Sequence, residues 1–271
     1  MGVLLNGAVD GRLVPEDRGL AYGDGVFRTL RLRDGRPVCW ARQYRKLQGD
    51  CEAIGLRCPT PELLKAELGR AGEGLREGVG KVIVTRGAGQ RGYAPPTHPE
   101  PNRIVSVGPL PAHPPSFREE GIRVHRCRLR LAIQPRLAGI KHLNRLENVL
   151  ARMEWTDPAI AEGLLLDAEG YLTEGIASNL FLVREGVLHT PDLSRCGVSG
   201  VTRERIMAIA LFERVPLRMA RLQWQDLLHA DEAILVNSLI GAWQIRCVQG
   251  REWDRGIWTP RIRGWLDASE D

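Results

Sequence analysis

Lysine is scarce in this chain of 271 residues, and one of its four lysines stands in a segment suited to chemistry. Lys141 lies in the largely apolar run Leu-Ala-Gly-Ile-Lys-His-Leu of residues 137–143, whereas thirty-four arginines supply most of the positive charge. Arginine stays protonated in proteins, but a partly buried lysine can lose its proton, form an imine and act as a base. We therefore expect Lys141 to be a catalytic residue that needs the chemistry of an amine.

Residues 197–203, Gly-Val-Ser-Gly-Val-Thr-Arg, place two glycines and two hydroxyl groups at the expected start of a helix. Unpaired backbone N–H groups and the helix dipole at such a position favour a phosphate. Glycine, serine and threonine also occur there purely as helix caps, so this pattern by itself leaves both interpretations open.

Two further segments carry charged groups beside turns. Glu174 stands between a turn and an apolar strand, and it is either a functional carboxylate or an exposed turn residue. Residues 86–93 follow a strand and combine a glycine-rich backbone with Arg86 and Arg91, which suits a clamp for a carboxylate. A solvated loop would show nearly the same composition.

The net charge of the chain is +5 and its isoelectric point is near 9.0. The arginines are interleaved with 33 acidic residues, so we expect a solvated surface with some anion sites and no nucleic-acid partner. The six cysteines lack metal-ligand spacing, which predicts reduced thiols and no metal site. No apolar stretch reaches the length of a membrane span and the first residues do not resemble a signal peptide, so we expect a cytoplasmic protein without membrane contact.

Proline density marks one break in the chain. Residues 108–115, Gly-Pro-Leu-Pro-Ala-His-Pro-Pro, exclude regular structure and suggest a linker. We expect a smaller N-terminal domain at residues 1–108, a linker at 109–117 and a larger C-terminal domain at 118–271. With 43% hydrophobic residues, each domain can form a core.

Helical and strand periodicities both occur along the chain, which predicts an α+β or α/β fold. The expected helices are residues 41–55 (burying Tyr44, Leu47, Cys51 and Ile54), 61–70, a stripe of Leu143, Leu146, Leu150 and Met153, and 201–212. The expected strands are a pair within 3–13, a strand leading to a hairpin at Asp34-Gly35, 81–85, 122–131, a pair within 163–183 with a turn at 169–170, and 232–236 as the last buried strand.

Four of these segments also resemble the motifs of a known superfamily, in the same order along the chain. They are residues 22–27 (Tyr-Gly-Asp-Gly-Val-Phe), 139–147 around Lys141, 173–181 with Thr-Glu-Gly and Asn-Leu-Phe, and 197–203. They resemble the fold-type-IV, or D-amino-acid aminotransferase-like, enzymes that use pyridoxal 5'-phosphate (PLP). This superfamily contains branched-chain and D-amino-acid aminotransferases and 4-amino-4-deoxychorismate lyases. The resemblance implies a two-domain fold, PLP as the cofactor and a homodimer.

The resemblance also assigns the residues that hold the cofactor. It implies that Lys141 carries PLP as a Schiff base and then acts as the base, and that Glu174 faces the pyridine nitrogen and keeps it protonated. The residues implied to bind the phosphate are Arg45, Val201, Thr202, Ser238 and Leu239.

Within the superfamily, the lysine segment and residues 86–93 most resemble the lyases, which split 4-amino-4-deoxychorismate into 4-aminobenzoate and pyruvate on the route to folate. Thr29 matches the threonine of the lyases that lies beside the catalytic lysine. Arg86, Arg91 and Tyr93 are the candidates for binding the carboxylates of this small-molecule substrate. Branched-chain aminotransferases carry a tyrosine at the position of Leu146, which counts against a branched-chain enzyme.

Two alternatives stay open. The first is a D-amino-acid or branched-chain-type aminotransferase of the same fold, which would exchange amino groups between an amino acid and a keto acid. The second is an anion-binding or nucleic-acid-binding protein without catalysis. Residues from 242 onward match no motif of the superfamily, so the sequence assigns them no function.

Overall fold

The computed structural model describes residues 2–268 and divides into two compact units. Among these residues, unit 1 contains 2–112 and 140–144, and unit 2 contains 113–139 and 145–268. The sequence places residues 140–144 in the C-terminal domain, but they belong to unit 1. Their backbone pairs with a strand of that unit, and such long-range pairing leaves no local signal in the sequence.

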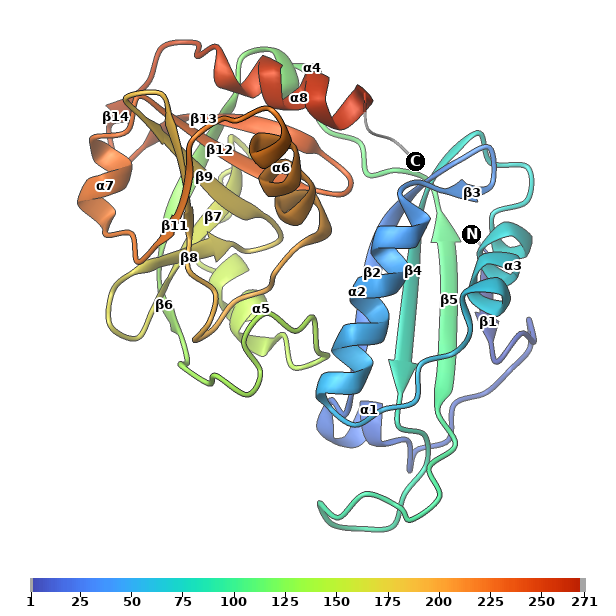
Figure 1. Ribbon diagram of the computed structural model, residues 1–271. Coiled ribbons are helices and arrows are strands. Elements are labelled where there is room, and N and C mark those ends of the chain that lie inside the picture. Colours follow the sequence, from blue (N-terminus) through green and yellow to red (C-terminus); the bar gives the residue numbers. More distant parts are fainter. Residues whose placement is uncertain (1, 269–271) are drawn as a thin grey trace. The chain divides into compact units, whose positions relative to one another are not determined.

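Unit 1 is built on a five-stranded antiparallel sheet in the order β1-β5-β4-β2-β3 (Figure 1). Its strands are β1 (Gly2–Leu5), β2 (Gly25–Arg33), β3 (Arg36–Pro37), β4 (Glu77–Thr85) and β5 (Asn102–Gly108). Its helices are α1 (Arg18–Tyr22), α2 (Trp40–Ala53) and α3 (Pro61–Ala71). The expected hairpin at Asp34-Gly35 is confirmed, because these two residues adopt positive φ angles between β2 and β3. The expected second strand within 3–13 does not form, and a single bridge joins Leu5 to Ala8 instead.

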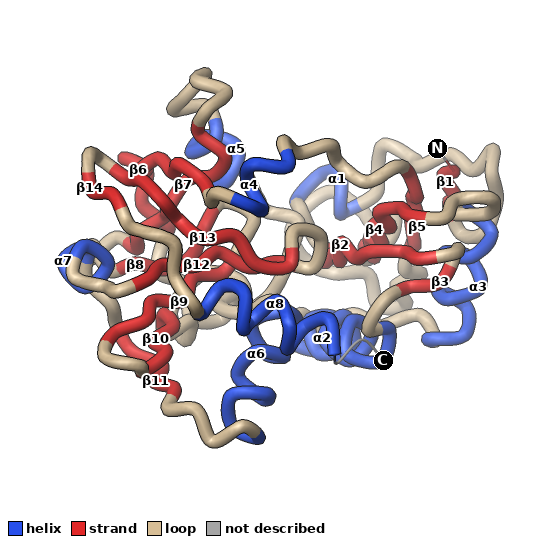
Figure 2. The backbone as a smooth tube through the Cα atoms, turned by 90° about the horizontal axis from the view of Figure 1, so that it is seen from above, coloured by secondary structure: helices blue, strands red, loops and turns tan. Residues whose placement is uncertain are grey.

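The two faces of this sheet differ in burial. Side chains alternate along a strand, so Val26, Leu30 and Leu32 of β2 point into the core, which α2 and α3 close (Figure 2). Phe27 and Thr29 lie on the other face and are half-buried. This second face, called the open face below, carries the side chains that matter for the site.

Unit 2 contains a nine-stranded mixed sheet in the order β11-β10-β9-β12-β13-β6-β7-β8, with β14 paired to β13. Its strands are β6 (Ile122–Leu131), β7 (Ile160–Asp167), β8 (Leu172–Gly175), β9 (Asn179–Arg184), β10 (Val187–Pro191), β11 (Leu217–Ala220), β12 (Glu232–Asn237), β13 (Gly241–Val248) and β14 (Arg251–Glu252). Its helices are α4 (Pro115–Glu119), α5 (Leu146–Arg152), α6 (Val201–Phe212), α7 (Trp224–Leu228) and α8 (Trp258–Ala268). Helix α4 begins inside the segment expected to be a linker.

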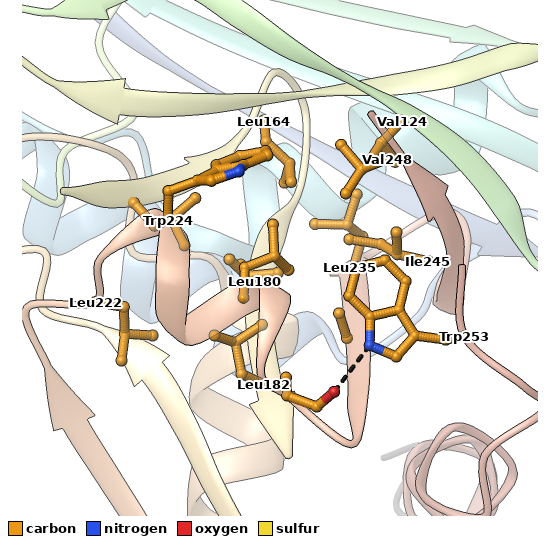
Figure 3. Packing of buried hydrophobic residues seen from close by; sticks show 14 of the residues in the cluster. Val124, Leu164, Leu180, Leu182, Leu222, Trp224, Leu235, Ile245, Val248 and Trp253 are labelled. Atoms are coloured by element: carbon orange, nitrogen blue, oxygen red, sulfur yellow. Dashed lines mark hydrogen bonds between the residues drawn. The ribbon is translucent and has the colours of Figure 1, made fainter. Parts of the chain in front are cut away.

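The expectation that residues 232–236 form the last buried strand is wrong. Strand β13 follows, pairs antiparallel with β12 and parallel with β6, and contributes Trp243 and Ile245 to the core. Figure 3 shows this core, in which the Trp253 indole N–H donates to the Ala230 carbonyl at 2.8 Å. Residues 242–268, to which the sequence analysis assigned no function, thus contribute most of β13 together with β14 and α8 to unit 2.

Residues 2–268 also show features that concern membranes, metals and thiols. None of the helices described there is both long and apolar enough to cross a membrane. No group of three or more histidine, cysteine or acidic side chains in these residues is arranged to hold a metal ion. All six cysteines are free thiols.

Candidate functional site

Residues 141–143 run antiparallel to the start of β2. The Phe27 N–H donates to the Lys141 carbonyl at 2.9 Å, and the Leu143 N–H donates to the Gly25 carbonyl at 3.0 Å. A Cβ atom on Gly25 would lie 2.5 Å from the Val84 carbonyl oxygen and 2.8 Å from Leu143 Cδ1. Glycine is therefore required in the motif of residues 22–27 because it lets the lysine segment approach the sheet.

The side chain of Lys141 is half-buried, and its Nζ lies 4.7 Å from the centroid of the Phe27 ring. Phe27 and Thr29 are two residues apart on one strand and therefore share the open face. The structure thus brings the predicted residues Lys141 and Thr29 to the same strand region of unit 1.

Lys81 is a residue of this region that the sequence analysis missed. It pairs with Thr29 across β2 and β4, is exposed, and places its Nζ 5.0 Å from the centroid of the same Phe27 ring. Strand alternation assigns Lys81 to one face of β4, but only the register with β2 shows that this face is the one that holds Thr29.

Arg86, which the sequence analysis expects to bind a substrate carboxylate, is bonded to other groups of the protein in this structure. Its Nε donates to Asp24 Oδ2 at 2.7 Å, and its two terminal nitrogens donate to the carbonyls of Gly55 and Ile54, each at 2.8 Å. The guanidinium is buried and all three of its nitrogens are bonded to the protein. Arg86 therefore joins β4 to the end of α2 and is a structural residue in this conformation.

Arg91 and Tyr93 lie in the exposed part of the same loop, and another buried arginine fixes its backbone. Arg18 donates to the carbonyls of Gly92 and Tyr93 at 3.0 and 2.9 Å, and its Nε donates to Asp24 Oδ2 at 2.9 Å. The Tyr93 side chain is 86% exposed, so it is available to a ligand. The sequence does not show that Asp24 and Arg18 hold this loop in place, because the residues of the loop that they bond are distant from them in the chain.

Glu174 of β8 is buried rather than exposed, which excludes the simple turn interpretation. Its Oε2 accepts the Val198 N–H at 2.8 Å. A Cβ atom on Gly197 would lie 2.6 Å from Thr173 Cγ2 and 3.4 Å from the Glu174 carboxyl carbon, so glycine permits this close packing. The carboxylate is thus fixed beside the glycine-rich loop.

The loop that leads into α6 is held by Asn179 of β9. The Asn179 amide donates to the Val198 carbonyl at 2.8 Å and accepts the Gly200 N–H at 3.1 Å. Gly200 is the N-cap of α6, and within the described residues no side chain caps this helix. Backbone N–H groups at the start of a helix, here at Val201 and Thr202, are of the kind that can bind an anion.

The other residues predicted to bind the phosphate do not all lie at the start of α6 with a free donor. The Thr202 and Ser238 hydroxyl oxygens lie 3.4 Å apart at the start of α6, and Thr202 is buried. The Leu239 N–H already donates to Asn237 Oδ1 at 2.8 Å, so that donor is engaged within the protein. Arg45 is exposed on α2, which is part of unit 1.

Comparison with known proteins shows the family of this chain. The model of the amino-transferase class IV family matches residues 25–248. The chain belongs to this family.

Two relatives within the family are aminodeoxychorismate lyases. The enzyme of Vibrio harveyi is 32% identical over 93% of this chain and 94% of its own length. The crystal structure of 4-amino-4-deoxychorismate lyase from Pseudomonas aeruginosa is 43% identical, covers 98% of both chains and superposes with a TM-score of 0.93. A D-alanine aminotransferase of Staphylococcus epidermidis is 27% identical over 89% of this chain and 85% of its own. The branched-chain aminotransferase of Escherichia coli, at 23% identity and a TM-score of 0.85, shares the fold, which confirms the predicted fold class.

The residues of this family member fit PLP chemically. PLP has a phosphate, which suits the uncapped start of α6 with the Thr202 and Ser238 hydroxyls, and a pyridine nitrogen, which suits the buried Glu174 carboxylate. Its aldehyde requires an amine. Lys141 supplies one, because its main chain is held by a hydrogen bond to β2 and its amine lies near the Phe27 ring.

Proposed function

We propose that this protein is a PLP-dependent lyase that converts 4-amino-4-deoxychorismate into 4-aminobenzoate and pyruvate. The observation that carries the proposal is the 43% identity, over 98% of both chains, with a structure described as this lyase. The curated lyase relative at 32% identity supports it. Thr29, the residue expected in a lyase, lies on the open face beside Phe27, whose ring neighbours the Lys141 amine.

In this proposal, separate groups of the chain hold the different parts of the cofactor. Lys141 would be the covalent attachment point and Glu174 would face the pyridine nitrogen, while the start of α6 with Thr202 and Ser238 would hold the phosphate. Only Ile140 separates Lys141 from Gly139, whose carbonyl accepts the Ser199 N–H at 3.1 Å. PLP, when bound, withdraws electrons from the substrate carbon that bears nitrogen.

The residues of the chain then have defined tasks. The Lys141 amine takes the proton from the ring carbon that bears the substrate nitrogen, and the Thr29 hydroxyl orients that amine. A negatively charged Glu174 keeps the pyridine nitrogen protonated. Loss of the proton lets the bond between the ring carbon and the ether oxygen break, so that enolpyruvate leaves, takes up a proton and becomes pyruvate. The ring becomes aromatic, which makes the step effectively irreversible.

For the substrate carboxylates we propose Arg91, Tyr93 and, in place of Arg86, Lys81. Lys81 is an exposed cation opposite Thr29 on the open face, so it suits an anionic group near the reacting carbon. Arg91 and Tyr93 are exposed on a loop whose backbone Arg18 holds in place.

The decisive experiment supplies the purified holoenzyme with 4-amino-4-deoxychorismate and measures both products. Formation of 4-aminobenzoate and pyruvate in equal amounts supports the lyase. Amino-group exchange between D-alanine and 2-oxoglutarate, without 4-aminobenzoate, would support the alternative that the D-alanine aminotransferase relatives suggest.

We also propose a cytoplasmic homodimer. Helix α5 and the residue after it expose an apolar stripe, with Leu146 67%, Leu150 47% and Met153 72% exposed, and a second copy of the chain is the partner expected to cover it. Light scattering should give twice the monomer mass for the wild type and the monomer mass for Leu150→Glu. Leu211→Glu, on an exposed residue of α6, is the matched control and should remain dimeric. Cell fractionation tests the location.

A further inference from the structure

Asp50 is a buried carboxylate of α2 that faces the lysine segment. Its Oδ2 accepts the backbone N–H of Lys141 at 3.1 Å and also pairs with the Arg28 guanidinium of β2. The side chains of Arg28 and Asp50 are only 4% and 3% exposed. This pair lies in the same unit as Lys141, so all three residues belong to one compact body.

A buried ion pair is a weak contributor to stability, because the loss of hydration offsets the attraction between the charges. Well-packed apolar side chains at these positions would often serve stability equally well. The contact with Lys141 gives the pair a second effect: the Asp50 carboxyl group accepts a backbone N–H and Arg28 holds it in place. Burial raises the pKa of Asp50, and the Arg28 guanidinium acts against this rise.

Together with β2, Asp50 fixes both polar groups of the Lys141 main chain. The Phe27 N–H holds the carbonyl oxygen at 2.9 Å, and Asp50 holds the N–H at 3.1 Å. Two bonds in different directions restrict rotation of the segment and thereby set the direction in which the lysine side chain leaves the backbone.

We propose that Asp50, held by Arg28, is the positioning residue of the catalytic lysine. This inference rests on the proposed function of Lys141, because it adds the device that aims its amine. Asp50 itself touches the main chain of Lys141 and takes no part in proton transfer.

The test compares two substitutions in the full-length holoenzyme, Asp50→Asn and Glu67→Gln. Glu67 is the matched control, because it is a second buried carboxylate of unit 1, bonded to Arg103 at 2.9 and 3.0 Å, between α3 and β5. Each substitution removes the charge of a buried carboxylate that is paired with an arginine, but only Asp50 contacts Lys141.

Two measurements distinguish positioning from stability. Hydrogen exchange at the Lys141 amide, resolved by mass spectrometry with fragmentation, should accelerate about tenfold in Asp50→Asn, because a neutral acceptor replaces a charged one. For 4-aminobenzoate formation, kcat should fall about tenfold or more while KM changes less than about threefold, because the amine is misplaced and the substrate contacts are intact. Glu67→Gln should lose about as much stability as Asp50→Asn but should change neither the exchange rate of the Lys141 amide nor kcat.

If Asp50→Asn does not fold, the double variant Arg28→Met/Asp50→Leu replaces it. This variant removes both charges and is expected to unfold no more easily than the wild type, yet to keep the faster Lys141 exchange and the lower kcat. Wild-type exchange and kcat in the double variant, or equal effects of Asp50→Asn and Glu67→Gln, would overturn the proposal. If the wild type makes no 4-aminobenzoate, the lyase assignment fails, and exchange at Lys141 still decides whether Asp50 holds the lysine.

Discussion

Replacing Glu174 by glutamine tests the link between a buried carboxylate and turnover. Glutamine has the same shape and can still accept the Val198 N–H, which bonds Glu174 at 2.8 Å in the wild type. A hydrogen bond to a charged acceptor contributes about 1.5–3 kcal/mol and one between neutral groups about 0.5–1.5 kcal/mol. We therefore expect Glu174→Gln to lower the free energy of unfolding by about 1 kcal/mol, which corresponds to a Tm decrease of about 2–4 °C.

The expected effect on turnover is much larger than the effect on stability. Without the negative charge, nothing at this position keeps the pyridine nitrogen protonated as charge develops on the substrate. Removal of one preorganised electrostatic group in an active site typically costs about 10²–10³ in kcat, or about 2.7–4 kcal/mol. We expect a loss of this size in the rate of 4-aminobenzoate formation, measured with saturating PLP so that occupancy is equal in both proteins.

Glu232→Gln is the control for this experiment. Glu232 is equally buried in unit 2, but its oxygens accept the backbone N–H groups of Trp258 and Thr259 at 2.9 and 2.8 Å, at the start of α8. The control should lose stability and keep its turnover. Near-normal turnover of Glu174→Gln at full PLP occupancy would refute the assignment of Glu174 to the pyridine nitrogen.

Three further outcomes are expected. Borohydride reduction of the holoenzyme should fix PLP on Lys141, and peptide mapping that found the label on Lys81, whose amine lies near the same phenylalanine ring, would contradict the assignment. Thr29→Ala should leave the bound-cofactor spectrum nearly unchanged but slow 4-aminobenzoate release at least about tenfold, and unaltered turnover would exclude Thr29 from the mechanism. Burial opposes ionisation of Asp24, but hydrogen bonds from two arginines outweigh it and lower its pKa below 3.8. The lower folded pKa stabilises the protein fully above about pH 5, and this contribution is lost as the pH falls through the folded value. The free energy of unfolding should thus fall more steeply between pH 5 and 3 in the wild type than in Asp24→Asn, as measured by urea titration.

Local periodicity was sufficient to predict several elements of the fold. Residues 122–131 and 201–212 form β6 and α6 with the expected bounds, and the helix expected at 41–55 is α2, with Leu47 and Cys51 buried as predicted. Each of these segments has a pattern that depends only on neighbouring residues. Strand β13 was missed although apolar and polar residues alternate from Trp243 to Cys247, and its parallel pairing with the distant strand β6 leaves no local signal in the sequence.

The site shows the same division between local and long-range information. Lys141 could be predicted as a catalytic residue from its residue type and its apolar surroundings in the sequence. The roles of Glu174 and Thr29 were predicted from the resemblance to a family. The sequence cannot show where a guanidinium will find its acceptors. Arg86 was therefore assigned to a substrate carboxylate, whereas its partners are Asp24 and two carbonyls of residues 54 and 55.

The excess of arginine over lysine has a structural reason that composition alone did not reveal. We expected the arginines on a solvated surface and at some anion sites, but Arg18, Arg86 and Arg203 are buried and bond backbone carbonyl oxygens of other segments. The planar guanidinium presents several donors in fixed directions and stays charged, so it can join two or three segments at once, as an ammonium group on a flexible stem cannot. Lysine is better suited to the opposite task, because its amine can lose a proton and form a covalent bond. Of the four lysines, Lys81 and Lys141 both lie against Phe27, on the face of the sheet where we place the reaction. The buried arginines thus supply permanent charge, and we place the reacting amine at Lys141 alone, with Lys81 as a neighbouring cation.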